Sequence, residues 1–151
     1  MYLLGTQETI DLISKDQERS LFAWLAEVMP GDTLFVSVIA LGQAAHMVET
    51  LGPDERPAWR RLLAEGRRTL SARGRVIDVD LDVVAAWANG LRGNPALTEK
   101  DPESGKEVPL PEDDRLVIAT AISRNYSLVT ARTPLLDRIA EFTTLTVVEP
   151  A

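Results

Sequence analysis

Short β-type runs alternate with helical patterns along the whole sequence, and this alternation constrains the fold more than any other feature. The predicted strands are Tyr2–Leu4, Thr33–Val38, Arg75–Val79, Tyr126–Thr130 and Leu145–Val148. Helical spacing of apolar residues fills the intervals, at Asp11–Met29, Leu41–Leu51, Pro57–Ala72, Asp80–Leu91, Glu112–Arg124 and Pro134–Glu141. Such an order predicts an α/β protein, a three-layer α/β/α fold with a mostly parallel central sheet of about five strands.

The length of the chain, 151 residues, suits one domain over residues 1–151 with a sizeable core. One helical stretch is predicted to end at Pro30-Gly31-Asp32. The segment Gly93–Pro111 is rich in proline, glycine and polar residues, so it is predicted to form a long surface loop of about twenty residues.

The charge of the chain is unevenly distributed. The formal net charge is −7, which argues against non-specific binding of nucleic acid by bulk charge. The segment Glu55–Arg75 nevertheless holds seven arginines and two acids, a local charge of +5, so the rest of the chain carries −12. This basic stripe is either a solvated helix face or a surface for phosphate or an acidic partner.

The sequence also suggests where such a protein works. It contains no cysteine, which excludes disulfides and thiolate metal sites and suits a reducing compartment. We find neither a signal peptide nor an apolar run near the ~20 residues that a spanning helix needs. We therefore expect a cytoplasmic protein that does not enter the membrane.

Four segments carry motifs with a recognisable order. They are MYLLGTQETID (Met1–Asp11), SVIALGQAAHMVETL (Ser37–Leu51), PLPEDDRLVIATA (Pro109–Ala121) and SLVTARTPLLD (Ser127–Asp137). Together they resemble the PIN-domain family, in particular its VapC and FitB-type toxins, whose usual patterns are LLDTN, SxITLxE, DxLIAATA and LVTRNxxDF. The resemblance covers nearly the whole chain. It implies four acidic corners that converge on one cleft at the carboxyl ends of the strands.

Three of the four acids that the resemblance implies are replaced in this sequence. Gly5, Gln43 and Leu135 occupy the first, second and fourth acidic positions, and Asp114 retains the third. Carboxylates are needed there because Mg²⁺ and Mn²⁺ are hard cations that prefer charged oxygen ligands. A cleft with one carboxylate is predicted to bind such ions weakly or not at all, so Asp114 is a possible metal ligand but otherwise no metal site is expected.

Asp114 has two interpretations that the sequence leaves open. It is a remnant of the metal site, or it belongs with Glu112 and Asp113 to an acidic first turn that stabilises the helix dipole. Other acids lie near the lost positions, and among them Glu8, three residues beyond Gly5, is placed to reach the cleft from the first helical turn.

The resemblance also implies residues that contact a phosphate. Thr6 and Thr130 persist from the first and fourth motifs, and Thr133 follows them near the same cleft. Arg132 is predicted to enter the vacated cleft as a cation that binds phosphate or pairs with Asp114; the alternative is that its side chain is simply exposed to solvent.

Active members of the family that this chain resembles are small dimeric, Mg²⁺-dependent ribonucleases that pair with a DNA-binding antitoxin. For this chain the resemblance therefore implies a homodimer, a small antitoxin partner and RNA as a possible partner. Whether it is an enzyme is left open. The first hypothesis is an inactive PIN-like protein retained as a binding or dimerising module, with no cofactor. The alternative is a weakly active Mg²⁺- or Mn²⁺-dependent endoribonuclease that uses Asp114 with relocated ligands.

Overall fold

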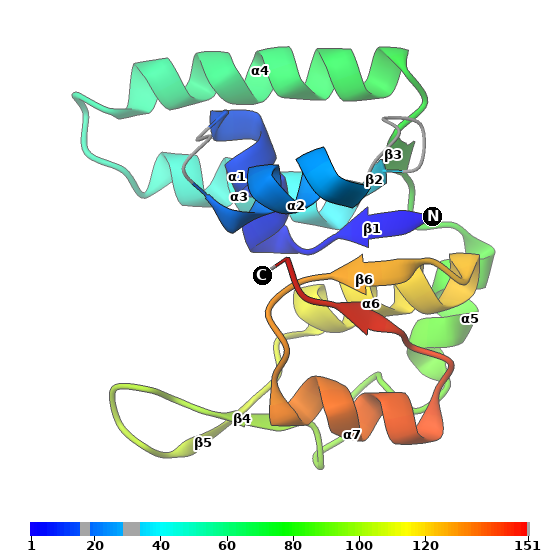
Figure 1. The fold of residues 1–151 in the computed structure, drawn as a ribbon. Helices are drawn as coiled ribbons and strands as arrows, with labels where there is room; N and C mark the ends of the chain where they lie inside the picture. Colours follow the sequence, from blue (N-terminus) through cyan, green and yellow to red (C-terminus); the bar gives the residue numbers. More distant parts are fainter. Residues whose placement is uncertain (16–18, 29–33, 151) are drawn as a thin grey trace.

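A five-stranded parallel sheet forms the centre of the molecule (Figure 1). The structure is a computed structural model and describes residues 1–15, 19–28 and 34–150. The strands β1 (Tyr2–Leu4), β2 (Leu34–Ser37), β3 (Val76–Ile77), β6 (Ser127–Val129) and β7 (Val147–Val148) lie in the order β3-β2-β1-β6-β7. Every pairing between neighbours in this sheet is parallel, which confirms the predicted three-layer α/β/α fold.

Helices cover both faces of the sheet (Figure 1). One side carries α1 (Thr6–Ser14), α2 (Ser20–Val28), α3 (Val38–Glu49) and α4 (Arg56–Ala72), and the other carries α5 (Leu81–Ala88), α6 (Glu112–Arg124) and α7 (Pro134–Phe142). Successive strand residues point to opposite faces, so Leu3 joins the core under α5–α7 and Leu4 joins the core under α1–α4. Both leucines are fully buried.

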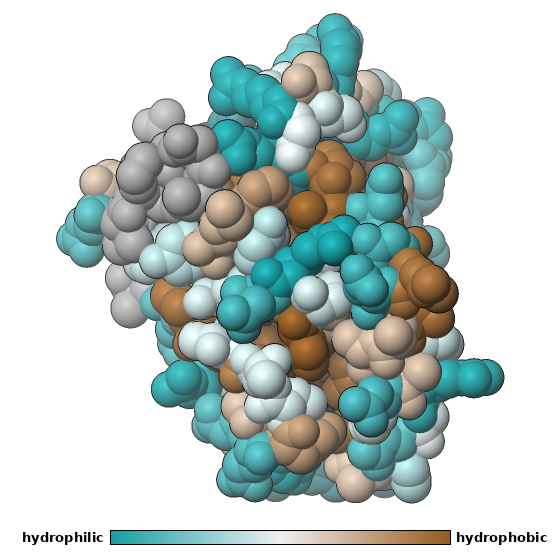
Figure 2. All heavy atoms as spheres, turned by 90° about the vertical axis from the view of Figure 1, so that its right-hand side faces the viewer, coloured by the Kyte–Doolittle hydropathy of each residue, from teal (hydrophilic) through white to brown (hydrophobic). Residues whose placement is uncertain are grey.

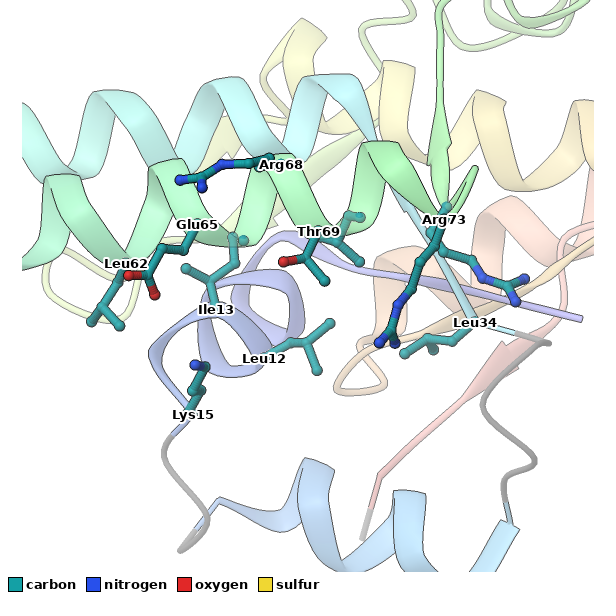
Figure 3. A pocket seen from close by; sticks show the side chains of 12 residues that line it. Leu12, Ile13, Lys15, Leu34, Leu62, Glu65, Arg68, Thr69 and Arg73 are labelled. Atoms are coloured by element: carbon teal, nitrogen blue, oxygen red, sulfur yellow. The ribbon is translucent and has the colours of Figure 1, made fainter.

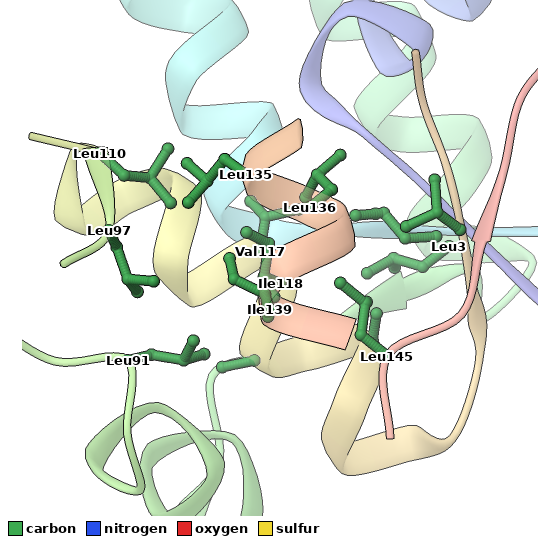
Figure 4. Packing of buried hydrophobic residues seen from close by; sticks show 14 of the residues in the cluster. Leu3, Leu91, Leu97, Leu110, Val117, Ile118, Leu135, Leu136, Ile139 and Leu145 are labelled. Carbon is green, nitrogen blue, oxygen red and sulfur yellow. The ribbon is translucent and has the colours of Figure 1, made fainter. Parts of the chain in front are cut away.

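The core beside α6 and α7 is a continuous apolar cluster (Figure 4). It includes Val117 and Ile118 from α6, Leu136 and Ile139 from α7, and Leu145 before the last strand. This cluster extends up to the carboxyl end of the sheet, where it forms the floor beneath the residues discussed below.

The predicted elements agree with the structure in kind and differ at their ends. The first helix begins at Thr6, directly after β1, whereas the sequence pattern places its start at Asp11. Helix α3 likewise begins directly after β2, with the Ser37 side chain accepting a hydrogen bond from the Ile39 N–H. Asp80 caps α5 by accepting from the Val83 N–H. The predicted turn at Pro30-Gly31-Asp32 lies outside the described residues.

The segment 93–111 holds a β-hairpin where a loop was expected. Strands β4 (Thr98–Lys100) and β5 (Glu107–Pro109) pair antiparallel. The base of this hairpin is fixed by Arg115, a buried side chain that donates to the carbonyl oxygens of Leu91, Asn94, Leu97 and Leu110. The sequence did not predict this hairpin, because exposed strand residues need no alternation of apolar and polar side chains.

The face at the amino ends of the strands mixes apolar patches with a band of hydrophilic side chains (Figure 2). Within the described ranges, no helix is both long enough and apolar enough to cross a membrane.

Candidate functional site: a cleft at the carboxyl end of the sheet

The predicted corners converge at the carboxyl ends of β1 and β6. A cavity of about 250 Å³ opens there, and its lining includes Gly5, Thr6, Asp114, Thr130, Thr133 and Leu135. Gly5 directly follows β1, Asp114 lies in the first turn of α6, and Leu135 lies in the first turn of α7. The structure thus brings together residues that are up to 130 positions apart in the sequence, as the motifs predicted.

Gln43 connects two of these corners by hydrogen bonds. Its side-chain carbonyl accepts from the Thr6 hydroxyl, and its amide group donates to Asp114 Oδ1 at 2.9 Å. A carboxylate accepts only, so the amide N–H₂ must face Asp114. The second and third corners are therefore joined by a neutral amide, where two carboxylates would need a cation between them.

Glu8 fills the space that a side chain at position 5 would occupy. A Cβ built on Gly5 would stand 2.6 Å from Glu8 Oε2, and 3.1 Å from both Cβ and Oγ1 of Thr130. This is close to the separation between the Cβ of an aspartate and its own carboxylate oxygens. The carboxyl of Glu8 therefore reaches the first corner from one turn along α1.

The environment of Glu8 disfavours its charge. The residue is only 7% exposed, and its Oε2 has no hydrogen-bond partner among the residues that the structure describes. Burial raises the pKa of the Glu8 carboxyl, and the charge of Asp11 adds to this rise, while polar contacts with the backbone and with Thr130 oppose it. An unpaired buried oxygen of this kind is a costly feature unless something donates to it.

The hairpin contributes a residue that the motifs did not reveal. Glu99 on β4 lines the cavity, and both partial burial and the negative charge of Asp114 raise its pKa. The only signal in the sequence was an acid inside a segment of unpredicted structure. The cavity lining keeps two carboxylates, of which Asp114 holds the third position of the family pattern and Glu99 stands on β4, an element that the pattern does not use.

The fourth corner has become part of the apolar core. Leu135 is 3% exposed and belongs to the cluster formed by α6 and α7. Figure 4 shows Leu110 and Leu135 pointing toward one another. A ligand for a cation is thus replaced by packing that closes the cleft floor.

Arg132 does not enter the cleft, contrary to one of the two interpretations. Its guanidinium lies 3.4 Å from Asp137 and donates to the Val147 carbonyl oxygen, and its side chain is 57% exposed. The residues on either side of it, Ala131 and Thr133, do line the cavity. The Thr133 hydroxyl is occupied as the cap of α7, where it accepts from the Leu136 N–H.

These residues do not fit the metal centre that the resemblance implies. In the part of the chain that the structure describes, no group of three acidic or histidine side chains is arranged to hold a metal ion. A glycine, an amide and a leucine stand where ligands are expected, and Asp114 Oδ1 already accepts from Gln43.

A larger groove lies on the other side of the molecule, between α1, α4 and β2 (Figure 3). Its volume is about 530 Å³. Leu12, Ile13, Leu34 and Leu62 give it an apolar surface, and Lys15 and Arg73 lie at opposite ends of it. Arg68, Arg73 and Arg75 all come from the basic stripe at 55–75.

The comparisons with known proteins identify the fold. No family model matches this sequence, and no curated protein matches it significantly. Among solved structures, the chain is similar over 99% of its length and 98% of the other chain to FitAcB from Neisseria gonorrhoeae, with 22% identity and a TM-score of 0.71.

Two further structures give the same result. One is VapBC2 from Rickettsia felis bound to a promoter DNA fragment, with 21% identity, a TM-score of 0.66 and coverage of 98% and 97%. The other is DNA-bound VapBC from Salmonella typhimurium, with 20% identity, a TM-score of 0.63 and coverage of 99% and 98%. The TM-scores show a shared fold, and at these identities the similarity shows the fold alone. From end to end, this chain has the fold of proteins found in VapBC and FitAB toxin–antitoxin complexes.

Proposed function

We propose that this chain is a PIN-domain protein of the VapC and FitB type that no longer cleaves RNA and acts as a binding module toward a small antitoxin. The proposed loss of activity rests mainly on one observation. The side-chain amide of Gln43 is hydrogen-bonded to both Thr6 and Asp114, so a neutral group connects these two residues of the cleft. Gly5 and Leu135 offer no ligand to a cation.

The groove in Figure 3 supports the binding role. Its apolar side chains would bury the apolar face of a partner segment, and its arginines would pair with acids that flank that face. An amphipathic, acidic segment of a DNA-binding antitoxin has this chemistry. Such a partner also suits the similar solved structures, which are toxin–antitoxin complexes. A location in the cytoplasm is part of this proposal.

The binding role is tested with the product of a short reading frame adjacent to its gene, co-expressed with this chain. We expect co-purification, and we expect it to be lost with Arg68→Glu and Arg73→Glu, which reverse two exposed charges of the groove. Arg61→Glu and Arg67→Glu are matched controls, because both are exposed on α4 but do not line the groove. Equal binding by all four variants would refute docking at this groove.

The loss of activity is tested by incubating the purified protein with single-stranded RNA and MnCl₂. We expect no cleavage above that of the Asp114→Asn variant. Cleavage that depends on both Mn²⁺ and Asp114 would support the second candidate, a weakly active endoribonuclease with relocated ligands. The observation in its favour is that Glu8 and Glu99 bring carboxyls to the first and third corners.

A homodimer is part of the proposal. Helix α5 exposes Leu81 and Val84, at 82% and 39% of their surface, on a side of the molecule that Figure 1 shows at the edge of the fold. Large apolar side chains exposed side by side favour contact with another protein surface. Light scattering of the wild type and of Leu81→Lys with Val84→Lys tests it: a dimer that becomes a monomer supports the proposal, and a monomeric wild type refutes it.

A further inference from the structure

Position 43 lies where α1, α3 and α6 meet in the cleft. We infer that Gln43 is a positioning residue that determines whether this cleft is held together by hydrogen bonds or by a divalent cation. With glutamine the cleft needs no ion; with glutamate it would depend on one. This inference rests on the proposed function, in which the wild-type cleft binds no metal.

The two hydrogen bonds of Gln43 have fixed directions. Asp114 can only accept, so it takes the amide hydrogen, and the remaining carbonyl oxygen accepts from the Thr6 hydroxyl. Thr6 stands 37 residues before Gln43, and Asp114 stands 71 residues after it. One amide thus connects side chains from three helices, α1, α3 and α6.

A single change of atom reverses one of these contacts. Gln43→Glu keeps the size of the side chain and still accepts from Thr6. Toward Asp114, however, an N–H donor becomes a second carboxylate oxygen at about the 2.9 Å separation of the present contact. Two carboxylates this close repel one another unless a proton or a cation lies between them.

Glu99 makes the repulsion larger and also defines what would relieve it. Its carboxyl already feels the charge of Asp114 across the cavity. A carboxylate at position 43 would therefore add a third negative group beside this cavity. Carboxylate oxygens are the hard donors that Mn²⁺ and Mg²⁺ prefer, so such an ion would relieve the repulsion.

The experiment is thermal unfolding of the full chain in EDTA and in millimolar MnCl₂. We expect the wild type to melt at the same temperature in both. Gln43→Glu should melt lower in EDTA, by roughly 5 °C for a domain of this size, and should recover most of that loss in MnCl₂. Gln43→Leu, which loses both hydrogen bonds without adding charge, should melt lower in both buffers.

A swap of donor and acceptor provides the decisive control. Gln43→Glu combined with Asp114→Asn restores one donor and one acceptor in reversed order. This double variant should melt near the wild-type temperature in EDTA, and MnCl₂ should not change its melting temperature. It also covers the case in which Gln43→Glu alone fails to fold in EDTA, since recovery through the swap would still show that the contact between positions 43 and 114 is responsible.

The outcomes separate this inference from the proposed function. A wild type that is stabilised by MnCl₂ would overturn the proposed function and this inference with it. The role of Gln43 alone would be overturned by a different result, in which MnCl₂ leaves the melting temperature of the wild type unchanged. In that case Gln43→Glu would either melt at the wild-type temperature in EDTA or show no rise in melting temperature on addition of MnCl₂.

Discussion

The contact between Gly5 and Glu8 predicts that the first corner of the cleft cannot be changed by itself. The perturbation is Gly5→Ala. The backbone of Gly5 is extended, with φ −66° and ψ 177°, so alanine adopts it without strain. Any destabilisation must therefore come from the new Cβ, which would stand 2.6 Å from Glu8 Oε2 and 3.1 Å from the Thr130 side chain.

The magnitude follows from overpacking and from its relief. Forcing an extra carbon into a packed site typically costs about 1–3 kcal/mol. In a chain that already carries Glu8→Ala, the nearest oxygen is absent and only the 3.1 Å contacts with Thr130 remain, so the same substitution should cost clearly less. The two changes should consequently couple by about 1 kcal/mol or more, above the ~0.5 kcal/mol within which independent sites add.

The assay is urea-induced unfolding of the wild type, both single variants and the double variant, followed by circular dichroism. We expect Gly5→Ala to lower the free energy of unfolding by more in the wild-type background than in the Glu8→Ala background, where only the contacts with Thr130 remain. Additive effects would refute the claim that Glu8 occupies the volume of a side chain at position 5.

The same geometry bears on restoring the acidic site. Gly5→Asp would place a second carboxyl against Glu8, and at an effective dielectric of 20 two charges about 4 Å apart repel by roughly 4 kcal/mol. A chain with Gly5→Asp should therefore be less stable than the same chain with Glu8→Ala added.

Three further predictions concern single residues. Glu8 in the folded chain holds its proton more tightly than in the unfolded chain, so its contribution to the free energy of unfolding falls as pH rises through its raised pKa. The free energy of unfolding of the wild type minus that of Glu8→Gln, measured by urea titration, should therefore become more negative with rising pH. A difference that does not change with pH would contradict this. Arg115→Leu removes the side-chain donor of four carbonyl oxygens, three of which keep a backbone donor. Because hydrogen bonds from a charged group contribute about 1.5–3 kcal/mol each, it should still cost about 3 kcal/mol in the same assay, whereas a loss below about 1 kcal/mol would argue against its role in fixing the hairpin. Leu135→Asp buries a charge in the apolar cluster and should lower the melting temperature far more than Leu135→Met, which keeps volume and polarity.

The layered fold could be predicted from the sequence because strand and helix patterns alternate with little ambiguity. The α6 helix agrees with its predicted bounds, Glu112–Arg124, since Pro111 and the acidic turn mark its start and Asn125 its end. The start of α1 was missed because Gly5 provides no side-chain cap, so no helix signal precedes Asp11. The hairpin at 93–111 was missed because its exposed strands carry no apolar alternation.

The cleft was only partly predictable. The motifs correctly brought Gly5, Asp114 and Leu135 to one place, since motif order on a parallel sheet determines which strand ends meet. They did not predict that Gln43 would bond to both Thr6 and Asp114, because donor and acceptor directions depend on side-chain positions. Arg132 was placed in the cleft by one interpretation, but Asp137 and the Val147 carbonyl hold it outside.

The most direct test of this account is a calorimetric titration of the wild-type protein with MnCl₂ at neutral pH. With three ligand positions held by Gly5, Gln43 and Leu135, we predict no saturable heat up to millimolar Mn²⁺. A saturable isotherm with a micromolar dissociation constant that disappears in Asp114→Asn would contradict it, because the ion would then be bound in the cleft that we describe as closed by hydrogen bonds.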